Sequence, residues 1–304
     1  MVPCWEYEWN HVYTPTYSAY STPWQVVNNV RSKITGTWDI IVDDDCPLPV
    51  GNHFDPPVQN ALQACVGNIA AARPGMYWML WNEPDQQHVP DSDNISPSLA
   101  ISYFVVISNT ILKRDPTARL IVGNVAAAYA TSPADKCAWS GGCGVFWLSR
   151  FITEGHTIGI TVTDFIAGYG FHAYPATNDL GIGGTDSCKP NDIFSTATDA
   201  CLLTNFTLTV KTAKDWVNQY DPGKELWLSE YNWTAFVEGS DTAALQVGRM
   251  GQMCDQLRNN WPVTRSAWLY LPHTVATPYS KGVQDLWHPD TGAISDSGVR
   301  YRTC

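Results

Sequence analysis

The stretch Trp78-Met-Leu-Trp-Asn-Glu-Pro-Asp85 joins an apolar run directly to an acidic side chain. The run begins at Tyr77, and its short length and aromatic content predict a buried strand over Tyr77–Trp81. Pro84 has no backbone N–H to give to a sheet, so the strand stops before it. Glu83 is therefore predicted at the carboxyl end of a strand, where a barrel of parallel strands carries its active site.

A second stretch repeats this arrangement later in the chain. Glu225-Leu-Trp-Leu-Ser-Glu230-Tyr-Asn-Trp233 is again an apolar strand candidate that finishes in a lone carboxylate flanked by aromatic residues. One glutamate at a strand end is ordinarily a solvated charge. Two in matching contexts favour a catalytic pair, because paired carboxylates serve as acid/base and nucleophile on a sugar acetal.

Other apolar or aromatic runs alternate with helical patterns along the whole chain. Predicted strands are Cys4–Trp9, Trp38–Val42, Tyr77–Trp81, Leu120–Asn124, Asp164–His172, Leu226–Tyr231 and Ser266–Leu271. Predicted helices are Val58–Ala72, Ser98–Lys113, Val145–Glu154, Phe206–Gln219 and Thr242–Asn259. The alternation predicts one parallel α/β domain over residues 1–304. A (β/α)8 barrel needs roughly 250 residues, which this chain provides.

The strand count predicts an irregularity near the start of this barrel. Only two strand candidates precede Tyr77–Trp81, whereas four follow it. Either one early strand is irregular, or the first barrel strand lies upstream of this chain. The Gly/Thr/Asp-rich stretch Asn178–Thr204 is interpreted as a loop excursion between a strand and a helix.

Composition excludes several classes of protein. The 304 residues carry 18 Lys+Arg and 29 Asp+Glu, a net charge of −11, and no apolar run is long enough to cross a membrane. The acidic balance and the absence of a basic run argue against nucleic acid or an anionic membrane surface as a partner. The 14 Trp and the low charged fraction exclude a disordered chain. A neutral partner such as a polysaccharide fits these properties.

The cysteines and sequons indicate an extracellular protein. Nine cysteines form no Cys-x-x-Cys pair, so disulfides are expected in place of a zinc site. Three glycosylation triplets begin at Asn94, Asn205 and Asn232, and the last is expected to be unused because it adjoins Glu230. The sequence after Met1 lacks the features of a leader, so we expect a mature chain whose leader was removed.

Motifs of other enzyme classes are missing from the sequence. It contains neither the Gly-x-Ser-x-Gly elbow of serine hydrolases nor the His-Glu-x-x-His motif of zinc proteases. The seven histidines show no metal-ligand spacing. No metal and no cofactor are therefore expected, and a monomer is the expected state.

Several motifs together resemble one group of enzymes. Asn82-Glu83-Pro84 and Glu230 resemble the signatures of clan A glycoside hydrolases, retaining (β/α)8-barrel enzymes with the acid/base after strand 4 and the nucleophile after strand 7. Gly170-Phe-His-Ala-Tyr-Pro175 and Ser266-Ala-Trp-Leu-Tyr270 look like their strand 6 and strand 8 elements. The opening Cys4-Trp-Glu-Tyr-Glu-Trp9 loosely resembles the second-strand motif of glycoside hydrolase family 128, the endo-β-1,3-glucanases.

The resemblance implies a role for each matching residue. Glu83 would protonate the leaving oxygen, helped by a raised pKa in a dry aromatic setting, and Glu230 would attack the anomeric carbon. The residues implied to bind sugar at or near subsite −1 are Asn82, His172, Tyr174, Trp268, Trp5, Trp9 and Trp233. Within this set Asn82 would bind the 2-hydroxyl, Tyr174 would orient Glu230, and Trp268 would form an apolar floor. Tryptophans near strand ends, Trp81 and Trp227 included, are expected on a sugar-binding surface.

The resulting prediction is a secreted retaining glycoside hydrolase acting on a neutral polysaccharide, first of all an endo-β-1,3-glucanase. Departures from the family 128 pattern, such as Glu8 where Asn is expected, leave other β-glucans, mannan and galactan open as substrates. A retaining transglycosylase on the same site is an alternative. A carbohydrate-binding barrel without turnover is an alternative of a different class.

Overall fold

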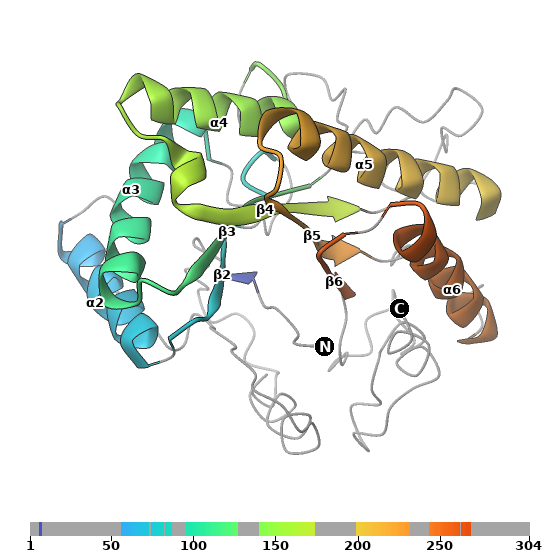
Figure 1. Ribbon diagram of the computed structural model, residues 1–304, viewed down its shortest axis with the longest axis horizontal. Coiled ribbons are helices and arrows are strands. Elements are labelled where there is room, and N and C mark those ends of the chain that lie inside the picture. Colours follow the sequence, from blue (N-terminus) through green and yellow to red (C-terminus); the bar gives the residue numbers. More distant parts are fainter. Residues whose placement is uncertain are drawn as a thin grey trace, which may run out of the picture.

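The computed structural model describes residues 6–7, 56–72, 74–81, 83–86, 95–126, 140–173, 199–231, 243–261 and 263–268. These residues alternate between strands and helices (Figure 1). In chain order the elements are β1 (Glu6–Tyr7), α2 (Pro56–Ala72), β2 (Tyr77–Leu80), α3 (Pro97–Arg114), β3 (Arg119–Val125), α4 (Val145–Thr157), the 3-10 turn η2 (Val162–Asp164), β4 (Ile166–Ala173), α5 (Asp199–Tyr220), β5 (Glu225–Tyr231), α6 (Ala243–Asn259) and β6 (Arg265–Trp268).

The strands form one sheet in which every pairing is parallel. Their spatial order is the chain order, from β1 to β6. The helices form an arc around the outside of this sheet, with α2 packed on α3, α3 on α4 and α5 on α6 (Figure 1). The predicted α/β class with a parallel sheet is therefore confirmed, and the carboxyl ends of the strands lie along one edge.

The first strand pairing differs from the order that the resemblance implied. The resemblance makes the segment Cys4–Trp9 strand 2 and Tyr77–Trp81 strand 4, with Trp38–Val42 as the strand between them. In the structure β1 pairs directly with β2, through Glu6 opposite Met79 and Tyr7 opposite Leu80. The predicted strand Trp38–Val42 lies outside the described residues.

Most predicted elements are confirmed with small shifts at their ends. Helix α3 begins at Pro97, where Ser96 Oγ accepts the N–H of Leu99 at 3.4 Å, and Asp115 follows its last residue. The prediction of a loop up to Thr204 was wrong, because α5 already begins at Asp199. Ala200, Leu202 and Leu203 have high helix propensity and favour this extension, and Leu203 packs against the core.

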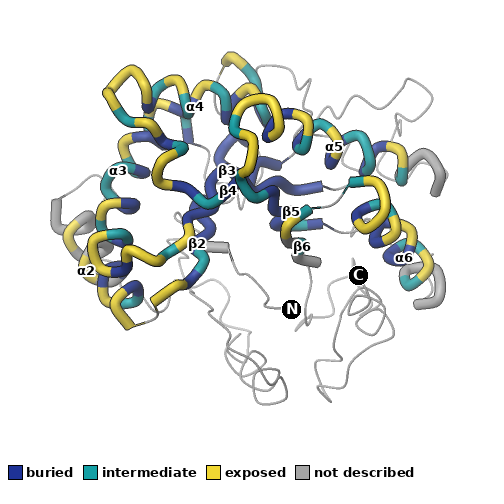
Figure 2. Tube along the Cα trace, in the orientation of Figure 1, coloured by how far each residue is buried: buried dark blue, intermediate teal, exposed yellow. Residues whose placement is uncertain are grey.

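The main core lies between the sheet and the helices, and its buried residues follow the strands in Figure 2. Trp81 is 1% exposed and packs edge-on against Trp147 and Phe151 of α4. Trp227 is 2% exposed and belongs to a small cluster with Met79 and Ile121. The expectation that Trp81 and Trp227 form a sugar-binding surface was wrong, because both side chains fill the interior.

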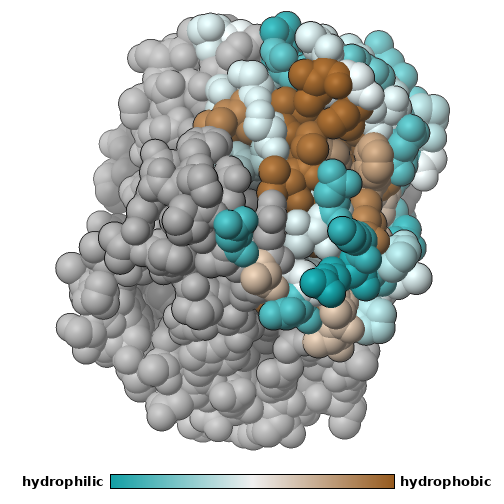
Figure 3. Space-filling view, turned by 90° about the vertical axis from the view of Figure 1, so that its left-hand side faces the viewer, coloured by the Kyte–Doolittle hydropathy of each residue, from teal (hydrophilic) through white to brown (hydrophobic). Residues whose placement is uncertain are grey.

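The outer surface is mixed in character. The side that carries α2 and α3 shows an apolar area bordered by hydrophilic side chains (Figure 3). Within the described ranges, no helix is both long and apolar enough to cross a bilayer. The glycosylation triplet at Asn205 is contradicted as a usable site, since Asn205 is buried in α5. Asn94 and Asn232 lie outside the described residues.

Candidate active site

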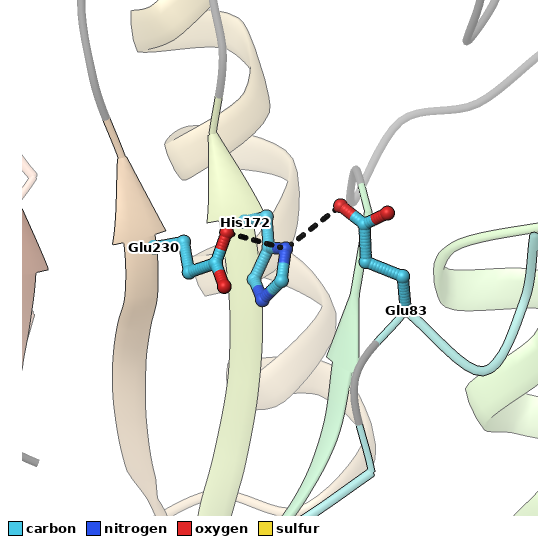
Figure 4. A group of neighbouring side chains, drawn as sticks. All are labelled: Glu83, His172 and Glu230. Atoms are coloured by element: carbon cyan, nitrogen blue, oxygen red, sulfur yellow. Dashed lines mark hydrogen bonds and ion pairs between the residues drawn. The ribbon is translucent and has the colours of Figure 1, made fainter. Parts of the chain in front are cut away.

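Three side chains from separate segments meet at the carboxyl ends of the strands. Glu83 follows β2, His172 is the penultimate residue of β4, and Glu230 is the penultimate residue of β5 (Figure 4). His172 Nδ1 lies 2.9 Å from Glu83 Oε1 and 3.5 Å from Glu230 Oε2. One ring nitrogen therefore faces both carboxylates, and an oxygen of each carboxylate lies within 4.8 Å of the other.

The three groups differ in their access to solvent. The His172 side chain is fully buried, whereas 11% of the Glu83 side chain and 20% of the Glu230 side chain are exposed. A neutral imidazole offers either one donor or one acceptor at Nδ1, depending on its tautomer. With a hydrogen on Nδ1, the ring donates to the carboxylates. With Nδ1 unprotonated, it accepts the proton of a protonated Glu83. The arrangement thus suits both protonation states of an acid/base.

Glu230 faces His172 because the strand register changes beside it. In β4 and β5, Phe171 is opposite Leu228 but His172 is opposite Glu230, so Ser229 is an extra residue. Leu228 and Tyr231 both lie in the core on the helix side. A bulge of this kind breaks the alternation of a strand and re-aims a side chain. Without it, alternation would place Glu230 on the same side as Leu228.

A second bulge lies in β3, next to Glu83. The register shifts between Gly123 and Val125, so Asn124 is the extra residue, and it has a positive φ of 46°. Asn124 Nδ2 donates to the carbonyls of Leu80 and Trp81, both at 3.0 Å. The Asn124 carbonyl in turn accepts the N–H of Glu83 at 3.0 Å.

A glycine in the next strand makes room for Asn124. A Cβ on Gly170 would lie 1.9 Å from Asn124 Oδ1, so no larger residue fits there without a shift. Trp81 and Glu83 also have positive φ, of 69° and 44°. Such conformations are costly for residues other than glycine and persist where surrounding contacts fix the backbone. Here those contacts come from the Asn124 side chain and carbonyl.

Asp85 is a further buried carboxylate at this site. It is 0% exposed, and its oxygens accept the N–H of Ala126 at 3.0 Å and that of Gly144 at 2.8 Å. Burial, with a smaller contribution from the nearby Glu83 charge, raises the pKa of Asp85 to about 6 against the lowering effect of these hydrogen bonds.

The sequence analysis missed both Asp85 and Asn124. Asp85 closes the stretch that carries Glu83, and Asn124 ends a predicted strand directly after Gly123. A Gly-Asn pair at a strand end is a recognisable signal, because both residues tolerate positive φ. Neither position by itself indicates which backbone groups it would bind.

The same three donors could also hold a cation. One ligand atom from each of Glu83, His172 and Glu230 lies within 4.8 Å of the other two. Carboxylate oxygen and imidazole nitrogen are ligands for zinc and other transition metals. In the structure the Glu83 and His172 donors are engaged with each other at 2.9 Å.

Of the predicted site residues, the structure brings together Glu83, His172 and Glu230. Trp268 is the last residue of β6, and its side chain is outside the described part. The remaining predicted residues all lie outside the described ranges: Asn82, Tyr174, Trp5, Trp9 and Trp233.

The chain is structurally similar to known glycoside hydrolases. An endo-β-1,3-glucanase of glycoside hydrolase family 128, subgroup I, from Amycolatopsis mediterranei, solved with laminaripentaose, is 21% identical with a TM-score of 0.50; the match covers 80% of this chain and 78% of that chain. A subgroup II endo-β-1,3-glucanase of the same family from Sorangium cellulosum is 19% identical with a TM-score of 0.50, covering 79% and 74%.

A glucosidase from Croceicoccus marinus also matches, at 11% identity and a TM-score of 0.50, over 80% of this chain and 45% of that chain. The sequence itself matches no family model and no curated protein at a significant level. The fold of this chain is therefore similar to that of family 128 β-1,3-glucanases and of another glycoside hydrolase, with the Glu83–His172–Glu230 group at the carboxyl ends of its strands.

Proposed function

We propose that this protein is a retaining glycoside hydrolase that cleaves β-1,3-glucan internally. The observation that carries the proposal is the approach of Glu83 and Glu230 across His172 at the strand ends. Retaining enzymes hold their two carboxyl groups about 5–5.5 Å apart, whereas inverting enzymes leave about 6.5–9.5 Å for a water molecule. A nearest-oxygen approach within 4.8 Å supports the retaining arrangement.

The reaction would proceed in two displacements. In the first, Glu230 attacks the anomeric carbon, the glycosidic bond breaks, and the proton of Glu83 passes to the leaving oxygen. In the second, Glu83 takes a proton from water, the water oxygen attacks the same carbon, and the bond to Glu230 breaks. The contact between His172 and Glu83 Oε1 would orient the second oxygen of Glu83 toward the bond that breaks.

The remaining sugar contacts are proposed from the family resemblance. Asn82 directly precedes Glu83 in sequence, and Tyr174 follows β4 closely after His172, so both stand next to the described site in the chain. Trp268 ends β6, beside β5 and Glu230. We propose that these residues bind the sugar at subsite −1, with Trp5, Trp9 and Trp233 as further stacking surfaces.

The β-1,3-glucan substrate is proposed from the structural neighbours. The Amycolatopsis enzyme is described as an endo-β-1,3-glucanase in complex with laminaripentaose, and the Sorangium enzyme as an endo-β-1,3-glucanase. The net charge of −11 agrees with a neutral glycan, since it would repel a polyanionic one.

We further propose that the parallel sheet closes into a (β/α)8 barrel within a single domain of residues 1–304. The strictly sequential strand order and the arc of helices on one side support this closure. A crystal structure tests the closure directly, and an open sheet would contradict it.

Secretion and a monomeric state also belong to the proposal. Cys143 and Cys254 are both buried, and each takes part in a disulfide bond, which supports an oxidising compartment. Recovery of folded protein only from oxidising expression, with thiol counts that fall on folding, is the expected result. Sedimentation at several concentrations tests the monomer.

The decisive experiment is a hydrolysis screen over laminarin, mixed-linkage glucan, cellulose, mannan and galactan, with the product anomer followed by NMR. We expect laminarin to be cleaved to a range of oligosaccharides with the β-anomer formed first. Initial α-product would refute retention, and glucose as the only product would refute internal cleavage.

A chelator tests the cation site. Activity unchanged by a chelator is expected, whereas loss of activity on chelation and its recovery with added metal would favour the cation site. Binding without turnover would favour the non-catalytic barrel.

A further inference from the structure

Asp85 contacts two segments that are distant in sequence, on either side of the Glu83 turn. Its Oδ1 accepts the N–H of Ala126, just after β3, and its Oδ2 accepts the N–H of Gly144, just before α4. Resting on the function proposed above, we infer that Asp85 is a positioning residue, whose carboxylate fastens the Glu83 turn to β3 and α4 and so fixes the acid/base against His172.

Asp85 attaches the end of β2 to the end of β3. The N–H of Glu83 donates to Asn124 O, and two residues later Asp85 accepts from Ala126, two residues beyond Asn124. Pro84 lies between them and has no N–H to donate. The Asp85 side chain thus continues the attachment of the β2 end to the β3 end past the point where backbone pairing stops.

Asp85 also attaches the Glu83 turn to the start of α4. The N–H groups at the start of a helix have no partner within the helix. Gly144 is the N-cap residue of α4 and has no side chain that could accept one of these N–H groups. The Asp85 carboxylate accepts the Gly144 N–H at the positive end of the helix dipole. The same helix packs on Trp81 through Trp147, so α4 contacts the chain both before and after Glu83.

The turn that carries Glu83 and Asp85 is itself closed by a hydrogen bond. The N–H of Gln86 donates to the carbonyl of Glu83 at 3.1 Å, which makes residues 83–86 one hydrogen-bonded turn. Glu83 has a positive φ of 44° within it. A rigid turn transmits a displacement at Asp85 to Glu83. A misplacement of about 1 Å at a catalytic group can lower the rate about 100-fold.

The chemical consequence is selective. The value of kcat/KM reports the first displacement, in which Glu83 supplies a proton only when the leaving group needs one. A sugar leaving group needs the proton, whereas a dinitrophenolate is stable as an anion and leaves without it. A misplaced Glu83 should therefore slow cleavage of a laminari-oligosaccharide and spare a dinitrophenyl β-laminaribioside.

The test is Asp85→Asn, which keeps the size of the side chain but replaces one acceptor oxygen with a donor. We expect kcat/KM for the oligosaccharide to fall about 10- to 100-fold and kcat/KM for the dinitrophenyl substrate to fall less than about threefold. Should Asp85→Asn not yield folded protein, Asp85→Glu keeps both acceptors, displaces the turn, and should give the same selectivity.

Asp115 provides a matched control. It is also buried, and its side chain accepts backbone N–H groups, among them those of Gly75 at 2.7 Å and Thr117 at 2.9 Å, but it precedes β3 at the other end of that strand. Asp115→Asn therefore removes the same kind of acceptor far from Glu83. It should leave kcat/KM for both substrates within about twofold of the unmodified enzyme.

A crystal structure of Asp85→Asn supplies a readout that does not depend on activity. We expect the 2.9 Å contact between Glu83 Oε1 and His172 Nδ1 to be lost in the variant and kept in Asp115→Asn. The inference is overturned if this contact persists in Asp85→Asn, or if both substrates slow equally. If the unmodified enzyme cleaves neither substrate, the proposed glycosidase function fails, while the crystal structures still decide whether Asp85 positions Glu83.

Discussion

The buried Asp85 carboxyl makes the stability of the fold depend on pH in a direction opposite to most carboxylates. Its pKa is raised from the ordinary value of 3.8 to about 6, chiefly by burial. Between these two values the folded state holds the proton more tightly than the unfolded state does. Stability contributed by the protonated group is therefore fully present below pH 3.8 and is lost as the pH rises through 6.

The size of this loss follows from the two pKa values. Each pH unit between 3.8 and about 6 contributes about 1.4 kcal/mol, so the full loss in the free energy of unfolding is about 3 kcal/mol. Most of it, about 2 to 3 kcal/mol, falls between pH 4 and pH 7. The Asp85→Asn variant has no ionisable side chain at this position, so its free energy of unfolding does not show this loss. Between pH 4 and pH 7, the free energy of unfolding of the variant should therefore rise by about 2 to 3 kcal/mol relative to that of the unmodified protein.

The measurement is urea unfolding followed by tryptophan fluorescence at pH 4, 5, 6 and 7. Asp115→Asn is again the control. Burial raises the pKa of Asp115, but the hydrogen bonds from Thr117, Gly75 and Ala118 outweigh it and hold that pKa below 3.8. The effect of Asp115→Asn on the free energy of unfolding should therefore be nearly constant from pH 4 to pH 7 and shrink only below pH 4. If the free energies of unfolding of Asp85→Asn and the unmodified protein differ by a constant amount from pH 4 to pH 7, the pKa of Asp85 is not raised by burial.

Four further substitutions, and a fifth that serves as a control, test the site and its support. Glu83→Gln and Glu230→Gln should each lower laminarin hydrolysis by at least about 100-fold with an unchanged circular dichroism spectrum, and near-normal turnover in either would contradict the catalytic pair. His172→Phe keeps a planar ring but puts carbon where the nitrogen faces both carboxylates, and it should lower kcat about 10- to 100-fold in the same assay. Gly170→Ala forces a Cβ against Asn124 and should lower the free energy of unfolding by about 1–3 kcal/mol, whereas Gly248→Ala, in open space on α6, should raise it by about 0.5–1 kcal/mol.

The sequence predicted the elements and the meeting of Glu83 with Glu230 well because both depend on local features. The run Tyr77–Trp81 is apolar, and Pro84, which cannot donate to a sheet, follows three residues later, so the strand and its approximate end are visible in the sequence. Parallel strands bring their carboxyl ends to one edge, which is why Glu83 and Glu230 could be expected to meet.

The tryptophans show where local reasoning fails. Trp81 and Trp227 stand near strand ends in sequence, which favoured an exposed sugar-binding face. A positive φ of 69° at Trp81 turns its side chain into the core beside Trp147, and Trp227 fills the other face of the sheet. Side-chain direction at a strand end depends on backbone turns that the residue type does not reveal.

The sequence by itself thus determined the α/β class, the parallel strands and the two glutamates, because apolar periodicity and strand termination are properties of short segments. Only the tertiary structure decided which way those glutamates face. Strict alternation would place Leu226, Leu228 and Glu230 on one face of β5, and the extra residue Ser229 instead turns Glu230 toward His172. A bulge arises from the pairing of two strands, so no single segment encodes it, and the same holds for the buried bonds of Asn124 and Asp85 that support Glu83.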